Sequence, residues 1–305
     1  QGTPWLIVSS RNLICYNQST SDPNGFPVYN TYQWIKNSVS LTRLLLPFNT
    51  MNQTNVKDYS SYNNHGTVNG ATWASNGIIG GAYSFSTLDS HQYLSIPHST
   101  TLDGGGTWSA MTIEHWIYLT ENQTGRRTIA KMSSQSEAQR SYEIGINNTM
   151  PANKLYGAVV IGSNSYKEVV YNTPLALNQW YHVALTYKSG VGVTLYLNGV
   201  QVATNTNQTT GTIQASPGRI LCIGAYNGTS SYLDGRIDEI RIYPIALTSQ
   251  QIYKDYLQER NGLSSSSTMV DEETNIGEVW KCAVTPSNTI FDGVTKISNS
   301  ITITT

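Results

Sequence analysis

Charged residues are scarce in this chain of 305 residues. Asp, Glu, Lys and Arg make up 12% of the sequence, and the formal net charge is -1. In typical soluble proteins about a quarter of the residues are charged. A nearly neutral chain lacks the basic surface that attracts nucleic acid or an anionic membrane, so we expect neither as a partner.

Long hydrophobic runs are also absent. No stretch reaches the roughly 18 consecutive apolar residues that a membrane-spanning helix needs, so we expect no membrane span. The first residues, "QGTPWLIVSS", contain neither a basic segment nor a small-residue cleavage site. We therefore expect that any signal peptide has already been removed.

Short strand-like runs dominate what is present. "GVTLYLNGVQVAT", "RILCIGAY" and "RIDEIRIYPIAL" are rich in β-branched residues and are separated by turn signals, which indicates an all-β fold. Asn198-Gly199 predicts a two-residue hairpin, because both residues tolerate the positive φ angles of a type I′ turn. A helix is predicted from Thr248, with Gln251 three residues later completing a capping box.

The middle of the chain resembles a laminin-G-like domain, a concanavalin A-type jelly roll, over about residues 44 to 260. The resemblance rests on "LLLPFNT", "GGAYSFSTLDSHQYLSIPHSTTL", "MTIEHWIYL", "NQWYHVALTYKSGVGVTLYLNGVQVA" and "GRIDEIRIYPIALTSQQI", which occur in the order typical of that family. It implies two antiparallel sheets packed face to face, about 10 Å apart.

The two flanks together resemble one immunoglobulin-like domain interrupted after its C strand. They carry Cys15 in "NLICY", Trp34 in "TYQWIK" and Cys282 in "EVWKCAVTP", the Cys, Trp, Cys order of that fold. The resemblance implies a Cys15–Cys282 disulfide. We expect a discontinuous Ig-like domain over 1–43 and 264–305, with the jelly roll inserted over 44–263 and "NGLSSSST" as an exit linker.

The third cysteine and several asparagines need separate interpretation. Cys222 lies on a predicted strand, where a small buried side chain is favoured over a reactive thiol. N-x-S/T motifs, together with the low charge, favour a glycosylated, exported protein. They occur at Asn17, Asn52, Asn122, Asn147, Asn207 and Asn227.

Calcium is the metal that the resemblance implies. Laminin-G-like domains often hold one Ca²⁺, and the matching positions here are Asn49, Asp58 and Asp238, which offer the oxygen ligands that this ion prefers. Asn49 stands where an aspartate is common, which removes one negative charge. The alternative for Asp58 is a turn residue without metal, and "SDPNGFP" is expected to be a β-turn.

Enzymatic chemistry is not expected. The HExxH, GxSxG, P-loop and GxGxxG motifs are absent. Asp238 and Glu239 are the candidate carboxylate pair of a glycoside hydrolase, but adjacent residues on a strand point to opposite faces. The prediction is therefore a protein without catalytic residues.

Two functions remain open, and a glycosidase is a third that the orientation of the carboxylates argues against. One is an extracellular adhesion or carbohydrate-binding protein, in which Trp73, Tyr93 and Trp108 stack on sugar rings; the alternative for each is core packing. The other is a subunit of a cell-surface filament or layer that pairs with like subunits through its terminal strands. In the alternative to that second function, both terminal strands pair within their own domain.

Overall fold

The computed structural model describes residues 2–88, 91–133, 136–207, 209–262 and 266–304. The chain is an all-β protein whose two largest sheets form a jelly-roll sandwich. None of the helices in these described ranges has the length and apolarity that crossing a membrane requires.

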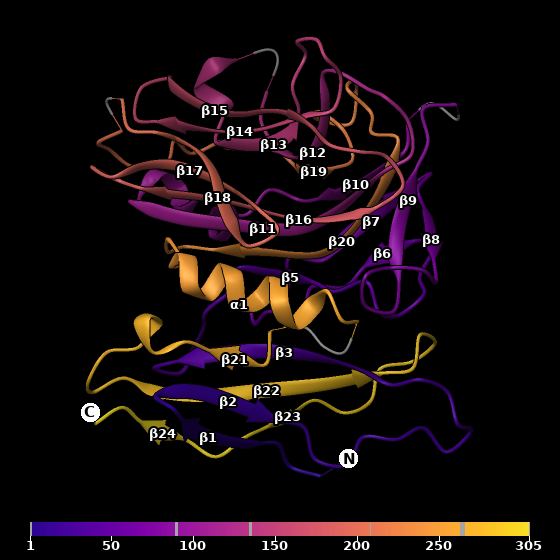
Figure 1. Ribbon diagram of the computed structural model, residues 1–305, viewed down its shortest axis with the longest axis vertical. Coiled ribbons are helices and arrows are strands. Elements are labelled where there is room, and N and C mark those ends of the chain that lie inside the picture. The colour runs from indigo at the N-terminus through magenta and orange to yellow at the C-terminus, as the bar shows by residue number, and fades with distance from the viewer. Residues whose placement is uncertain (1, 89–90, 134–135, 208, 263–265, 305) are drawn as a thin grey trace.

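The first large sheet, here called the outer sheet, lies at the top of Figure 1. In spatial order its strands are β15 (Ser165–Pro174), β14 (Lys154–Ile161), β13 (Tyr142–Ile146), β12 (Arg126–Lys131), β19 (Leu221–Ile223), β10 (Tyr93–Ile96), β7 (Gly66–Asn69) and β6 (Asn55–Val56).

The second large sheet, here called the inner sheet, packs beneath it. Its strands are β18 (Val200–Asn205), β17 (Gly192–Leu197), β16 (Trp180–Lys188), β11 (Ala110–Leu119), β20 (Gly235–Tyr243), β9 (Ala82–Phe85) and β8 (Thr72–Ala74), and β5 (Leu44–Leu46) pairs with β20. Short 3-10 turns occur at Thr100–Leu102, Gly104–Gly106, Glu137–Gln139 and Asp271–Glu273.

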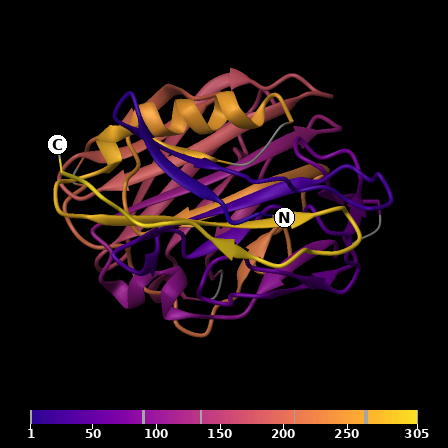
Figure 2. The same cartoon turned by 90° about the horizontal axis from the view of Figure 1, so that it is seen from below.

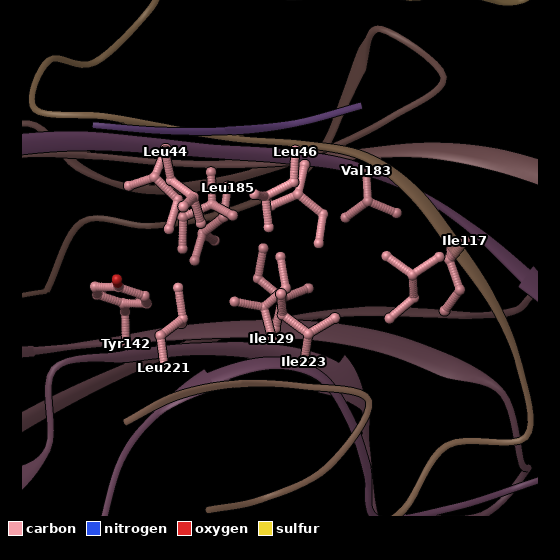
Figure 3. Packing of buried hydrophobic residues seen from close by; sticks show 14 of the residues in the cluster. Leu44, Leu46, Ile117, Ile129, Tyr142, Val183, Leu185, Leu221 and Ile223 are labelled. Carbon is pink, nitrogen blue, oxygen red and sulfur yellow. The ribbon is translucent and has the colours of Figure 1, made fainter. Parts of the chain in front are cut away.

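Strand alternation builds the core between these two sheets. Leu44, Leu46 and Leu185 point from the inner sheet toward Tyr142 and Ile129 of the outer sheet, as Figure 3 shows. Side chains alternate along a strand, so the residues between them point to the opposite faces of the sandwich. Burying each large aliphatic side chain contributes about 1.5–3 kcal/mol, which makes this interface the main source of stability for the jelly roll.

Two smaller sheets come from the ends of the chain and lie below the jelly roll (Figure 1). One contains β1 (Trp5–Ser9), β2 (Asn12–Tyr16) and β21 (Thr268–Met269). The other contains β23 (Lys296–Ile297), β22 (Val279–Ser287), β3 (Tyr29–Lys36), β4 (Val39–Ser40) and β24 (Ile301–Thr302). Figure 2, seen from below, shows these terminal strands lying across the jelly roll.

A disulfide joins the two terminal sheets. Cys15 on β2 is bonded to Cys282 on β22, as the Ig-like resemblance implies. Trp34 lies directly opposite Cys282 in the register of β3 and β22. Its ring and that of Trp280 meet edge-on, with their centroids 6.2 Å apart. The bridge and the two tryptophans therefore form one buried centre between the sheets.

The hairpin and the helix form where the sequence predicts them, with one correction. Asn198 and Gly199 have φ angles of 51° and 77° between β17 and β18. Thr248 caps α1 (Ser249–Glu259) by accepting a hydrogen bond from the Gln251 amide. The capping box, however, is not closed by the Gln251 side chain, because Glu273 accepts from the Thr248 amide at 2.6 Å.

The predicted exit linker is wrong for its last residues. Ser266 is buried and accepts a hydrogen bond from the Trp34 indole, while the Cys15 amide donates to the Ser267 carbonyl. Thr268 then begins β21; residues 263–265 lie outside the described residues. Residues 267 and 268 are fixed because their backbone pairs with β2, which the Ser-rich composition does not reveal.

Helix α1 lies between the jelly roll and the terminal sheets (Figure 1). Tyr243 and Ile252 from the central part of the chain share one hydrophobic cluster with Leu13, Trp34 and Cys282 from its two ends. The central and terminal parts are thus packed together through a common apolar cluster.

A buried charged cluster fastens α1 to the inner sheet. Arg241 of β20 pairs with Glu239 at 2.8 Å and with Glu259 of α1, and Glu114 of β11 lies 3.8 Å from its guanidinium. Asp255 of α1 accepts from Gln251 and from Ser266. Burial is the largest cause that raises the pKa of Asp255, to about 7, and it raises the pKa of Glu114 well above its usual range.

The terminal strands pair within the chain. Leu6 on β1 faces Cys15 on β2, and Ile301 on β24 faces Trp280 on β22. The side-chain amide of Asn299 binds both the amide and the carbonyl of Leu6. This is the alternative in which both terminal strands pair within their own domain. β1 is an edge strand of its sheet, and Asn299 covers that edge at Leu6.

Candidate functional site

A groove of about 550 Å³ opens on the outer sheet, on the face turned away from the core. Its lining residues come from β12, β13 and β15, from the segment between β12 and β13, and from the loop after β19. They are Arg127, Met132, Arg140, Glu143, Tyr166, Tyr226, Ser230 and Ser231.

Strand register explains why these side chains meet. Tyr142 and Ile144 point into the core, so Glu143 between them must point outward. Glu143 faces Ala158 on β14, and Ala158 faces Glu168 on β15, which places all three on the same face. The short side chain of Ala158 leaves room between the two glutamates.

Glu143 is the centre of a hydrogen-bonded network in this groove. Arg127 lies 2.6 Å from one of its oxygens, and the Tyr166 hydroxyl donates to the other at 2.8 Å. The same hydroxyl lies 3.4 Å from Glu168. The network fixes the orientation of Tyr166, whose side chain remains exposed to solvent.

Aromatic rings accompany the arginine. The Arg127 guanidinium lies 5.1 Å from the Tyr156 ring and 5.5 Å from the Tyr226 ring. Tyr226 is held by its loop, since its amide donates to the Ser230 carbonyl. These cation–π contacts hold the guanidinium in place and leave Tyr226 at the wall of the groove.

The electrostatics of the groove are balanced. Burial is the largest single effect and disfavours the charge of Arg127, but Glu143, Tyr156 and Tyr166 together outweigh it, and the pKa of Arg127 is raised. Burial, followed by the nearby Glu143 charge, raises the pKa of Tyr166 and of Tyr226, so both hydroxyls stay neutral at physiological pH. Burial also raises the pKa of the half-buried Glu168. Neutral hydroxyls, one fixed ion pair and aromatic surface can together bind a polyhydroxylated ligand.

The sequence alone did not reveal this site. Arg127, Glu143, Tyr166 and Tyr226 lie on separate segments, and none belongs to a recognisable motif. The period-two alternation of β13 predicts that Glu143 points outward. It does not predict which side chains of other segments lie beside it. The search for paired carboxylates within one strand therefore missed Glu143 and Glu168, which sit on different strands of the same face.

The aromatics predicted to stack on sugars do not line the groove. The Trp73 indole donates to the Phe48 carbonyl at 2.8 Å, and both Trp73 and Trp108 pack against the core. Tyr93 lies on β10 against Gly228 of the loop that carries Tyr226. The structure thus does not bring these three side chains together as one binding surface.

Two of the three implied calcium ligands converge on the loop 77–81. Asp238 accepts from the amides of Ile78 and Ile79, and a Cβ on Gly80 would lie 2.5 Å from Asn49 Oδ1. Asn49 is fully buried, and neither atom of its amide group has a hydrogen-bond partner among the described residues. An unpartnered buried oxygen beside the same loop that the Asp238 carboxylate contacts fits a cation that accepts oxygen ligands.

Asp58 has a different environment. Its carboxylate accepts from the amides of Leu45, Ser60 and Asn64 and from the Ser60 hydroxyl. These bonds fit the alternative in which Asp58 is a turn residue. No group of three or more His, Cys, Asp or Glu side chains suited to a metal occurs in the part of the chain that the structure describes.

The remaining predicted positions differ in exposure. Burial raises the pKa of Cys222 to about 12, so this buried thiol stays protonated. Among the N-x-S/T asparagines, Asn52, Asn122 and Asn207 are exposed, Asn17 and Asn227 are half-buried, and Asn147 is buried. "SDPNGFP" forms the predicted turn, with Gly25 bonded to Asp22.

Comparison with known proteins identifies the central domain. The family model described as the concanavalin A-like lectin/glucanases superfamily matches residues 88–253, which is more than half of the chain. A search of the curated proteins found no match.

Solved structures share the fold at low sequence identity. Domain 4 of AbnA, an extracellular arabinanase of Geobacillus stearothermophilus solved with arabinotriose, is 20% identical, with 70% of this chain and 97% of that chain covered and a TM-score of 0.52. The botulinum neurotoxin serotype G binding domain is 14% identical, with 72% and 51% covered and a TM-score of 0.57.

The binding domain of botulinum neurotoxin DC, solved in complex with SialylT, is 17% identical, with 72% of this chain and 52% of that chain covered and a TM-score of 0.55. The chain spans about half the length of the toxin binding domains that it matches. At these identities the likeness concerns the fold alone.

Proposed function

The chain belongs to the concanavalin A-like lectin/glucanases superfamily, and from this premise we propose that it is an extracellular binding protein that holds carbohydrate in the groove of its outer sheet. The observation that carries the proposal is the Arg127–Glu143–Tyr166 network beside the Tyr226 ring. Preorganised polar groups beside an aromatic face match the alternating hydroxyls and apolar ring faces of a sugar.

Two further observations support the proposal. The arabinanase domain, of which 97% is covered by this chain, was solved with arabinotriose, so this fold accommodates carbohydrate in another protein. One toxin binding domain, of which 52% is covered, was solved with SialylT. The Cys15–Cys282 disulfide supports an extracellular location, because structural disulfides persist mainly in oxidising compartments.

The groove is proposed to bind without cleaving. Glu143 in the groove and Glu168 on the same face of the sheet resemble the carboxyl pair used by glycoside hydrolases. Glu143, however, is engaged by both Arg127 and Tyr166, and these bonds occupy its two oxygens. Release of reducing sugar from a bound oligosaccharide would contradict the non-enzymatic assignment while leaving the binding site intact.

Glycan-array screening followed by calorimetric titration tests the binding proposal. Tyr226→Ala and Glu143→Gln are expected to weaken binding about tenfold or more, since each removes a contact that is preorganised for the ligand. Tyr253→Ala is the matched control, because Tyr253 is an exposed tyrosine on α1, away from the groove. Equal affinity in all three variants, or no glycan bound, would refute the site.

Calcium is proposed as a structural ligand of the same domain. Asn49 and Asp238 would hold the ion against the loop 77–81, where it would neutralise a buried carboxylate whose pKa is raised, mainly by burial. Calcium is expected to raise the melting temperature, and Asn49→Asp to strengthen that effect by adding a negative ligand. Unchanged melting after chelation, with no calorimetric heat, would rule calcium out.

The terminal sheets are proposed to form one Ig-like domain. Their orders, β1-β2-β21 and β23-β22-β3-β4, correspond to strands A-B-E and G-F-C-C′ of that fold. On this assignment the jelly roll is inserted between C′ and E. The Cys15–Cys282 bridge beside Trp34 supports the same assignment.

A second candidate function is a subunit of a cell-surface filament or layer. It is favoured by the edge position of β1 in its sheet, where the exposed Trp5 faces the exposed Tyr16 across the hairpin. Asn299 binds the edge groups of Leu6, so it would have to release them before another strand pairs along β1. Edge strands of this kind can pair with another chain. Electron microscopy should then show filaments that disappear when residues 1–9 are deleted; filaments that persist would exclude this edge.

A further inference from the structure

A second cavity lies where the jelly roll meets the terminal sheets. Its volume is about 520 Å³, within the range of small-molecule sites. The lining residues come from two parts of the chain, residues 48–83 of the jelly roll and the loop that precedes β23. They are Phe48, Thr50, Asn52, Asn55, Val56, Lys57, Tyr59, His65, Tyr83 and Asp292.

Three aromatic rings form much of its wall. Phe48 and Tyr83 are buried, and their rings meet at 87° with centroids 4.9 Å apart. The Tyr83 hydroxyl donates to the Asn52 carbonyl at 2.6 Å, which fixes that ring. Tyr59 supplies the third ring and donates its hydroxyl to Asp292 at 2.8 Å.

One carboxylate provides the negative charge of the cavity. Asp292 accepts from Thr50 at 2.6 Å as well as from Tyr59, so its orientation is fixed by groups of the jelly roll. A fixed carboxylate beside aromatic faces is the arrangement that binds organic ammonium groups, because both the charge and the ring quadrupole attract a cation.

The chain already places an ammonium group of its own in this position. Lys57 forms an ion pair with Asp292, and its Nζ lies 4.4 Å from the centre of the Tyr59 ring. About half of the Lys57 side chain is exposed to solvent, so it can leave without disturbing the core. Lys57 therefore resembles an internal ligand that an external one can replace.

We propose that this cavity binds an organic ammonium group carried on a small apolar or sugar-ring scaffold, which displaces Lys57 from Asp292 and Tyr59. The carrier rests against Phe48 and Tyr83, and its cation takes the place of the lysine. This site is separate from the groove on the outer sheet and goes beyond the carbohydrate-binding proposal.

Titration with tetramethylammonium, followed by NMR or calorimetry, tests the proposal. Lys57→Met removes the competing cation but keeps the length of the side chain, and is expected to bind about fivefold more tightly than the wild type. Asp292→Asn is expected to lose most of the affinity. Tyr59→Leu is also expected to lose affinity, because it removes the aromatic face that attracts the cation. It provides a second test should Asp292→Asn fail to fold.

Lys188→Met is the matched control, since Lys188 is exposed at the end of β16 and outside the cavity. Glucosamine and Nα-acetyl-lysine methylamide, titrated in parallel, distinguish an amino sugar from a lysine side chain of another protein. Affinity that is unchanged in Lys57→Met, or equal in all variants, would overturn the proposal. Tyr226→Ala should leave ammonium binding intact, which separates this result from that of the groove.

Discussion

Cys15 on β2 and Cys282 on β22 are covalently joined across 267 residues of sequence, with their Cα atoms 6.2 Å apart. The whole jelly roll therefore lies inside the loop that this disulfide closes. The bridge ties the entry and the exit of the central domain to one buried centre.

Replacing both cysteines with alanine is expected to lower the free energy of unfolding by up to about 5 kcal/mol, because a loop of this length gains much entropy in the unfolded chain when it is opened. Chemical denaturation of the double variant, compared with the wild type under oxidising conditions, measures the difference. A single Cys222→Ala variant controls for loss of a buried thiol. Equal midpoints for the wild type and the double variant would show that the bridge contributes no stability.

Arg241→Met is expected to destabilise the protein by roughly 3–5 kcal/mol. The variant removes the cation that pairs with Glu239 and Glu259 and leaves both carboxylates buried without that opposite charge, although Glu259 still accepts from the Trp116 indole. Urea denaturation provides the measurement. Arg260→Met, which removes an exposed arginine near Tyr256, should change stability by less than about 1 kcal/mol. Similar losses in both variants would contradict the role of the buried cluster.

Stability is expected to fall as the pH rises from about 4 to 7. Burial, the largest cause, raises the pKa of Asp255 from 3.8 to about 7 in the folded protein. A carboxyl with a raised pKa contributes stability while it is protonated, and this contribution is lost as the pH approaches the folded value. Melting temperatures across this range should decline less in Asp255→Asn than in the wild type, and parallel curves would contradict the assignment.

Glycan occupancy, if the protein is made in a glycosylating host, is expected to follow exposure. Asn52 is exposed, whereas Asn147 is 7% exposed. In both, the side-chain oxygen accepts from the amide and the hydroxyl of the threonine two residues later, so exposure is what distinguishes them. Peptide mapping by mass spectrometry should find glycan on Asn52 and none on Asn147. A fully occupied Asn147 would require this turn to open before modification.

Local features were predictable because short-range physics decides them. The Asn198-Gly199 turn needs positive φ at adjacent residues, and Thr248 can cap a helix whatever the helix packs against. The family of the central domain was also recognisable, since its motifs follow one another along the chain. The hydrogen bond from the Thr248 amide to Glu273 was not predictable, because the tertiary fold brings Glu273 to the start of the helix.

The residues of the groove could not be predicted from the sequence either, because they too are brought together by the tertiary fold. Glu143 and Glu168 become neighbours only because β13, β14 and β15 pair in one register, and Tyr226 reaches them from a loop more than 50 residues further along the sequence. Packing also buried Ser266 and paired Thr268 and Met269 with β2, at the end of a segment whose composition is that of a linker. The sequence by itself thus determined the strands, the hairpin, the helix and the all-β class, through backbone preferences and alternation. Only the tertiary structure decided which outward-facing side chains meet, because register and sheet order bring together residues whose separation along the chain carries no such information.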